Sequence, residues 1–233
     1  MSSTQIFFIL LTFLAPPALA WGSRRFAAQN FDRRVRLSLA WGLLAFDVIE
    51  LAGKELDGTF SLQKALPMQL CDWALFASAA ALLLGSQLPF ELAYFWGLAG
   101  TIQALFTPAI GSDLAYWRVG GFFAIHSGIV IAVLYLVLAA RKRPRSLLPI
   151  LVASEIYVAL ALAINAAVDG NYGFLSGKPA THSLLDFLSH DHWVYVLQLN
   201  GIAITAFLLL YAPWWIADRS AARSSRDNVP TDR

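Results

Sequence analysis

Two side chains of this sequence have the chemical types needed for covalent chemistry inside an apolar segment. They are the single cysteine, Cys71, and a histidine, His126. A thiol reacts as its thiolate, and burial among apolar groups disfavours that charged form, so a nearby base is needed. A neutral imidazole within hydrogen-bond distance would accept the proton. Together the two residues would attack an ester carbonyl, hold the acyl group as a thioester and pass it to a hydroxyl group or to water.

Both residues also have a structural interpretation. A lone cysteine in a membrane segment commonly packs as a small apolar side chain. A lone histidine there commonly makes a hydrogen bond that joins neighbouring helices. Judged by spacing alone, catalysis by Cys71 and His126 is one hypothesis and simple packing is the other.

Further polar and aromatic side chains would complete a substrate site around this pair. They are Asp47, Glu50, Gln69, Asp72, Trp96, Gln103, Asn171, Tyr172 and Lys178. One of the three carboxylates would orient the imidazole, as the third member of a catalytic triad does. The side-chain amides of Gln69 and Gln103 would donate hydrogen bonds to an oxyanion.

The depth of these polar groups predicts where such a site lies. Ionisable groups in hydrocarbon are costly unless they pair or serve a function. Nearly all of the groups fall in the outer half of the membrane, so we predict a polar cavity that opens outward and is capped by residues 171–192. Trp96, Gly100, Gln103 and Thr107 have the spacing of one stripe along a helix. The alternative is that the polar groups merely hydrogen-bond helices together.

The elements that must position these residues are membrane-spanning helices. Of the 233 residues, 58% are hydrophobic and 14% are charged, whereas about a quarter are charged in soluble domains. There are seven apolar segments, most of them near the ~20 residues that cross a bilayer, and the first two are shorter. We expect them at 5–21, 37–53, 66–85, 89–108, 117–140, 147–168 and 193–217. The predicted fold class is therefore all-α, a polytopic membrane bundle over residues 1–218, followed by a basic, disordered cytoplasmic tail at 219–233.

The basic residues predict the orientation. With the N-terminus outside, 13 of the 17 lysines and arginines fall on the cytoplasmic side, as the positive-inside rule requires. Residues 18–20 resemble a signal-peptidase site, but residues 1–5 carry no positive side chain, and cleavage would place these basic residues on the wrong face. We therefore expect a retained first helix, a cytoplasmic C-terminus, a multi-pass protein of the cell membrane, and lipids rather than nucleic acid as partners.

Other chemistry has little support in the sequence. There is no glycine-rich phosphate loop, HExxH or GxSxG motif, and we expect no cofactor. His182, His190 and His192 lie in the last outer connection without further cysteines, which is a weak signal for a metal. We interpret them as solvated loop residues and predict no metal site.

Five stretches of the sequence resemble the YwaF family of integral membrane proteins. They are LPMQLCD at 66–72, ELAYFWGLAG at 91–100, HSGIV at 126–130, NYGFL at 171–175 and KPAT at 178–181. The resemblance runs through all seven segments in order. That family is similar to transmembrane protein 164, described as a cysteine-dependent acyltransferase that moves polyunsaturated acyl chains onto ether phospholipids. The resemblance implies that Cys71 is the nucleophile and His126 its partner, whereas Gln69 stands where many YwaF-type sequences have histidine.

Three functional hypotheses follow. The first is a cysteine-dependent phospholipid acyltransferase or acyl hydrolase that uses Cys71 and His126 in a cavity of the outer leaflet. The second is a non-enzymatic transporter or ligand-binding protein in which Asp47, Glu50 and Glu155 handle a cation or a proton. The third is a structural membrane subunit that has no cavity.

Overall fold

The computed structural model describes residues 1–108, 110, 116–179 and 183–227. All regular structure in these residues is helical, which confirms the predicted all-α class, and each of the seven predicted segments contains a helix. The elements are α1 Ser3–Arg25, η1 Ala27–Gln29, α2 Phe31–Leu56, α3 Leu62–Ala65, α4 Leu70–Leu84, α5 Gln87–Trp96, the π-helical turn η2 Gly97–Thr101, α6 Ile102–Phe106, α7 Tyr116–Leu138, α8 Leu148–Val168, η3 Tyr172–Phe174, η4 Leu184–Phe187 and α9 His192–Asp227.

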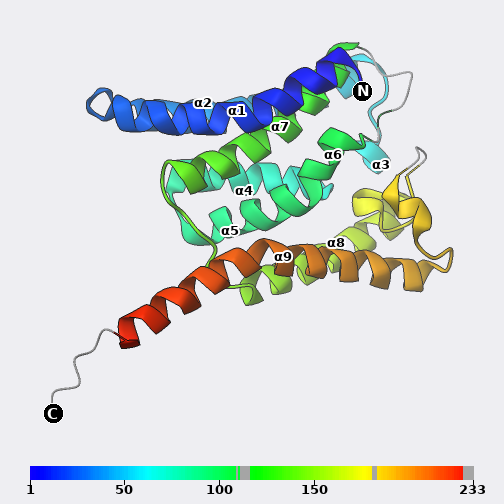
Figure 1. The fold of residues 1–233 in the computed structure, drawn as a ribbon. Helices are drawn as coiled ribbons and strands as arrows, with labels where there is room; N and C mark the ends of the chain where they lie inside the picture. The colour runs from blue at the N-terminus through cyan, green and yellow to red at the C-terminus, as the bar shows by residue number, and fades with distance from the viewer. Residues whose placement is uncertain (109, 111–115, 180–182, 228–233) are drawn as a thin grey trace.

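The helix α4 is the centre of the bundle. It packs against α2, α5 and α7, and Figure 1 shows α1 and α2 along one edge of the molecule with α8 and α9 along the other. Small side chains let its neighbours approach closely. Its buried residues are Ala74, Leu75, Ala77, Ser78, Ala79, Ala81 and Leu82.

Four helices are long and apolar enough to cross a membrane: α1, α7, α8 and the part of α9 at His192–Ser220. The remaining three predicted spans contain charged residues, a short helix or an interrupted helix. The helix α2 carries Asp47, Glu50 and Lys54 in its apolar part. With 15 residues, α4 is about 22 Å long, which is shorter than a ~30 Å hydrocarbon core. The seven-span count and the orientation stay predictions.

The fourth predicted span, residues 89–108, is divided by the π-helical turn η2. A π-turn takes more residues than an α-turn, so side chains beyond it rotate onto another face. Trp96 before the turn is 3% exposed, whereas Gly100 and Thr107 are exposed. The predicted stripe is therefore wrong, because its spacing assumed an uninterrupted α-helix.

The first helix is joined to α7 by side-chain hydrogen bonds along its length. Thr12 Oγ1 donates to Ser127 Oγ at 2.9 Å, and the hydroxyl groups of Ser23 and Tyr135 lie 2.7 Å apart. Near the end of α1, Arg24 donates to the backbone oxygen of Leu138. These bonds join α1 to the bundle, and the retention of this segment stays a prediction.

The last helix continues beyond the predicted membrane segment. The helix α9 runs to Asp227, so residues 219–227 of the predicted disordered tail are helical. Residues 228–233 of that tail lie outside the described residues.

Candidate functional site

The first turn of α4 holds Cys71. The preceding Gln69 has an extended backbone, and its N–H donates to Asp72 Oδ2 at 2.8 Å, a capping interaction that begins the helix. Pro67 disfavours helix for the residue before it, which keeps the chain extended up to this point. The half-buried thiol of Cys71 makes one long hydrogen bond, from Sγ to Asp72 Oδ1 at 3.9 Å.

The predicted cap of the site packs directly against this start of α4. Tyr172 is fully buried, and its hydroxyl group accepts from Leu66 N at 3.0 Å and donates to Leu62 O at 2.6 Å. The side-chain amide of Asn165 accepts a hydrogen bond from Tyr172 N at 2.7 Å and donates one to Tyr172 O at 3.0 Å. The hydroxyl bonds fix the η3 segment to the residues that lead into α4, and the Asn165 bonds fix it to the end of α8.

Gly173 brings its backbone against the same segment. Its N–H donates to Gln69 Oε1 at 3.0 Å. Its φ of +64° is one that residues with a Cβ rarely adopt, and a Cβ here would lie 2.6 Å from Tyr157 Oη. The position therefore requires glycine.

An aromatic cluster adjoins Cys71. The ring of Trp73 meets those of Tyr157 and Trp96 at centroid distances of 5.6 and 6.1 Å. Trp96 is fixed by a hydrogen bond from Nε1 to Ser154 Oγ at 2.9 Å. The phenol of Tyr157 donates to the backbone oxygen of Met68, three residues before Cys71, at 3.1 Å. The thiol thus lies beside a rigid, mostly apolar wall from α4, α5 and α8.

Two contacts set the register of α2 against α4. Arg36 Nε donates to Leu82 O at 2.9 Å, and Lys54 Nζ near the end of α2 donates to Lys64 O in α3, just before α4, at 3.2 Å. The helices therefore run in opposite directions. Asp47 follows Arg36 by eleven residues, and Cys71 precedes Leu82 by eleven residues. With an equal rise per residue in both helices, Asp47 and Cys71 lie at one height.

A similar register relates α2 to α7. A Cβ placed on Gly128 would lie 2.9 Å from Leu43, and an ion pair nearer the outer end shows that these helices are also antiparallel. Asp47 follows Leu43 by four residues, so it lies level with Ala124. His126 is two residues away, or about 3 Å along the axis. Asp47 and His126 therefore share nearly the same height.

The imidazole of His126 has a defined tautomer. Its Nδ1 lies 2.7 Å from Phe122 O, and because a carbonyl oxygen only accepts, Nδ1 carries the proton and Nε2 is left as an acceptor. The residue is buried, and its ring packs on that of Phe122 at 4.0 Å. Within the described part of the chain, no hydrogen bond joins His126 to Cys71. From the registers of α2 with α4 and α7, we infer that the imidazole of His126 and the thiol of Cys71 lie at similar heights along the bundle. They are not hydrogen-bonded to each other in the described structure.

Comparison with known proteins adds one finding to this geometry. A family model described as the TMEM164 family matches residues 1–211. The chain belongs to the TMEM164 family. The match contains every predicted site residue, and membership together with the apolar helices makes the chain a membrane protein. No curated protein and no solved structure matches it. The resemblance to the YwaF family stays an interpretation.

Glu50 of this TMEM164-family chain is placed in an ion pair. Its Oε1 accepts from Arg118 at 2.8 Å, and Arg118 also contacts Asp57 at 3.3 Å. Arg118 is only 6% exposed, so a charged group near the start of α7 is buried against the C-terminal part of α2. The pairing of Arg118 with Glu50 was not predicted from the sequence. The signal was present, because Arg118 is one of only four basic residues on the predicted outer side and begins an apolar segment.

Three other predicted residues lie outside the group around Cys71. The Asn171 side chain closes its own loop, accepting from Ser176 N and Gly177 N. Lys178 Nζ donates to backbone oxygens of η4 and the residue after it, including Leu188 O at 2.6 Å. The amide of Gln103 is half-buried on α6 and has no hydrogen-bond partner among the described residues. Their roles in substrate binding stay predictions.

The outer connection gives no new reason to expect a metal. His190 and His192 are exposed, and His182 lies outside the described residues. The described residues contain no group of three histidine, cysteine or acidic side chains that would hold a metal ion.

The two clefts that stand out in the described structure are not lined by Cys71 or His126. One lies between α2 and α4, at the far end of α4. The other, of about 560 Å³, runs along α9 and is lined by Gln198 and Thr205 among mostly apolar residues. The polar cavity around Cys71 therefore stays a prediction.

Proposed function

We propose that this protein is a membrane enzyme that transfers or hydrolyses acyl groups of phospholipids, with Cys71 as nucleophile and His126 as general base. The observation that supports this most is the antiparallel packing of α2 on α4 and on α7, from which we infer similar heights for Cys71, Asp47 and His126. The tautomer of His126 adds to it, because Nε2 is an acceptor and can take a proton.

The reaction begins with proton transfer from the Cys71 thiol to His126 Nε2. The sulfur then attacks the ester carbonyl of a phospholipid, and the carbon–oxygen bond breaks as the imidazolium returns its proton to the leaving alkoxide. The products are a lysophospholipid and an acyl thioester. A second hydroxyl group, or water, gives its proton to Nε2 and attacks the thioester, and the released thiolate is reprotonated.

The surroundings of the thiol suit a lipid substrate. The aromatic wall of Trp73, Trp96 and Tyr157 offers an apolar surface to an acyl chain. The carboxylates of Asp47 and Asp72 are the acidic groups on the helices beside the reacting pair, and a carboxylate near the imidazole would stabilise the imidazolium by its charge. Substrate binding turns the His126 ring toward Cys71, a side-chain movement within one layer of the bundle.

The proposal includes a topology of seven spans with the N-terminus outside and the C-terminus in the cytoplasm. Cys71 then faces the outer leaflet of the cell membrane, and the opposite end of the bundle carries Arg36, Lys142 and Arg145. Clustering of basic groups at this end agrees with the positive-inside rule.

The transport hypothesis receives less support. It assigned ion handling to Asp47, Glu50 and Glu155, but Glu50 is bound by Arg118 at 2.8 Å. Glu155 accepts a hydrogen bond from Asn200 at 2.9 Å on the surface between α8 and α9. These carboxylates do not form one ion pathway in the described structure.

Acyl turnover in a defined membrane tests the proposed function. The purified protein is placed in nanodiscs with an acyl-donor phospholipid and a lysophospholipid acceptor, and products are measured by mass spectrometry. Cys71→Ser and His126→Ala are expected to lose most of the turnover, by about 100-fold or more. The matched control His190→Ala removes an exposed histidine and should leave turnover unchanged. Equal turnover in all four proteins would end the enzyme hypothesis.

A further inference from the structure

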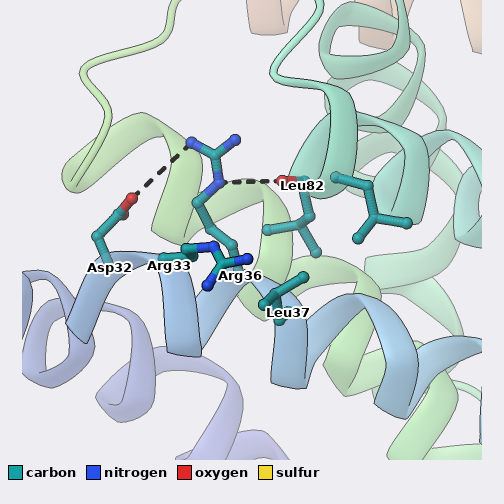
Figure 2. A pocket seen from close by; sticks show the side chains of 6 residues that line it. Asp32, Arg33, Arg36, Leu37 and Leu82 are labelled. Carbon is teal, nitrogen blue, oxygen red and sulfur yellow. Dashed lines mark hydrogen bonds and ion pairs between the residues drawn. The ribbon is translucent and has the colours of Figure 1, made fainter. Parts of the chain in front are cut away.

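A cleft of about 400 Å³ lies between the start of α2 and the end of α4, at the end of α4 opposite Cys71. Figure 2 shows the guanidinium group of Arg36 reaching between Asp32 and Leu82 at this place. The cleft combines charged and apolar side chains. Its lining residues are Asp32, Arg33, Arg36, Leu37, Leu82 and Leu83.

Arg36 is held in a fixed position across the cleft. Its Nε donates to Leu82 O at 2.9 Å, and its Nη1 lies 3.9 Å from Asp32 Oδ2. The first contact has a structural purpose, because the last carbonyl groups of a helix lack partners within it. Both contacts together use only part of the five N–H donors of a guanidinium group. The rest of the group is available to an acceptor in the cleft.

Arg33 has no comparable structural purpose. It is exposed, it lines the cleft, and it makes no hydrogen bond or ion pair with any residue that the structure describes. Asp32 is the one acidic residue among those that line the cleft, so its single negative charge offsets only one of the two arginines. The cleft therefore keeps an excess of positive charge.

A further cation strengthens the field near the cleft. Lys142 Nζ donates to Gly85 O at 2.7 Å and to Ser86 O at 3.2 Å, just beyond the end of α4. Burial lowers the pKa of Lys142, and the positive charges of Arg36 and Arg145 lower it further. Three cations thus lie near the end of α4, and the carboxylate of Glu91 acts on Lys142 in the opposite direction, so the positive charge that faces the cleft is chiefly that of Arg33 and Arg36.

We propose that this cleft binds the phosphate group of an anionic phospholipid, with Arg33 and Arg36 on the phosphate oxygens. The planar guanidinium group matches the geometry of phosphate and binds it through two parallel hydrogen bonds. Leu37, Leu82 and Leu83 continue the cleft as an apolar surface for the upper part of the acyl chains. A soluble phosphate compound presents the same oxygens but has no group for these leucines.

Native mass spectrometry of the full-length protein in detergent tests the site. Dioleoyl phosphatidylglycerol and, separately, dioleoyl phosphatidylcholine are titrated into wild type, Arg33→Gln, Arg33→Lys and Arg34→Gln. Arg34 is the matched control, since it is the neighbouring exposed arginine but does not line the cleft. Loss of Arg33 is expected to weaken phosphatidylglycerol binding about fivefold, and lysine should restore part of it. Arg34→Gln should bind phosphatidylglycerol normally. Phosphatidylcholine has the same phosphate but also a choline cation, which the two arginines repel, so it should bind weakly and alike in all variants.

The outcomes separate a site from diffuse attraction and a lipid from a soluble ligand. Equal weakening by Arg33→Gln and Arg34→Gln would overturn the proposal, because the cleft would then have no special role. Competition by millimolar glycerol phosphate identifies a soluble phosphate compound as the occupant and overturns the lipid assignment. Unfolding temperatures of the variants are measured alongside, and we expect no change, because Arg33 contacts no described partner through its charge.

Discussion

The side-chain oxygen of Gln69 accepts a hydrogen bond from the backbone N–H of Gly173 at 3.0 Å. This bond joins the residue before α4 to the connection between α8 and α9, more than one hundred positions later in the chain. Tyr172 adds two hydrogen bonds to the same approach to α4. The segment that carries Cys71 and the loop above it therefore form one structural unit, and changes in the loop should affect the site.

Gly173→Ala is expected to destabilise the protein by about 1–3 kcal/mol. The new Cβ meets Tyr157 Oη, and the backbone has a positive φ that alanine disfavours. Thermal unfolding in detergent measures the loss. Gly177→Ala is the control in the same loop, because nothing lies within 4 Å of a Cβ there. Gly58→Ala has a positive φ in open space and measures the backbone effect alone. Matching losses in Gly173→Ala and Gly58→Ala would show that the contact with Tyr157 is unimportant.

Tyr172→Phe should lower the free energy of unfolding by about 1–3 kcal/mol, because it leaves Leu66 N and Leu62 O without their partner. Chemical denaturation gives this value. Tyr116→Phe is the comparison, since Tyr116 is 83% exposed and its hydroxyl group bonds only to Thr4 in the described structure. If both variants unfold alike, the hydroxyl group of Tyr172 does not hold the loop on α4.

Arg118→Met is expected to cost about 3–5 kcal/mol, because it leaves the carboxylate of Glu50 buried without its cation. The double variant Glu50→Gln with Arg118→Met removes both charges and should recover part of that loss. A double-mutant cycle on unfolding free energies measures the coupling. Additive effects of the two substitutions would mean that the ion pair does not join α2 to α7.

The helices were predictable from sequence to a large extent. Long apolar segments indicated where the helices lie, and all seven segments contain one, although α2 begins six residues before its predicted start at 37. The capping role of Asp72 follows from its place three residues after Gln69. These features depend on neighbouring residues only, which is why a single sequence reveals them.

Other features depend on which helices meet, and the sequence does not show this directly. The π-helical turn at Gly97–Thr101 broke the predicted stripe, because one added residue in a turn changes every face beyond it. The pairing of Glu50 with Arg118 joins residues 68 positions apart. Placing Cys71 level with His126 required contacts of Arg36 and Leu43 that only packing defines.

The intact mass of the purified protein after incubation with a phospholipid donor tests directly whether Cys71 forms an acyl thioester. We expect an added acyl mass on the single cysteine, which hydroxylamine removes. This added mass should be absent in Cys71→Ser and strongly reduced in His126→Ala. Because there is one cysteine, a thioester has one possible location. If the wild-type protein turns over lipid but carries no acyl mass, Cys71 is not the nucleophile of the reaction.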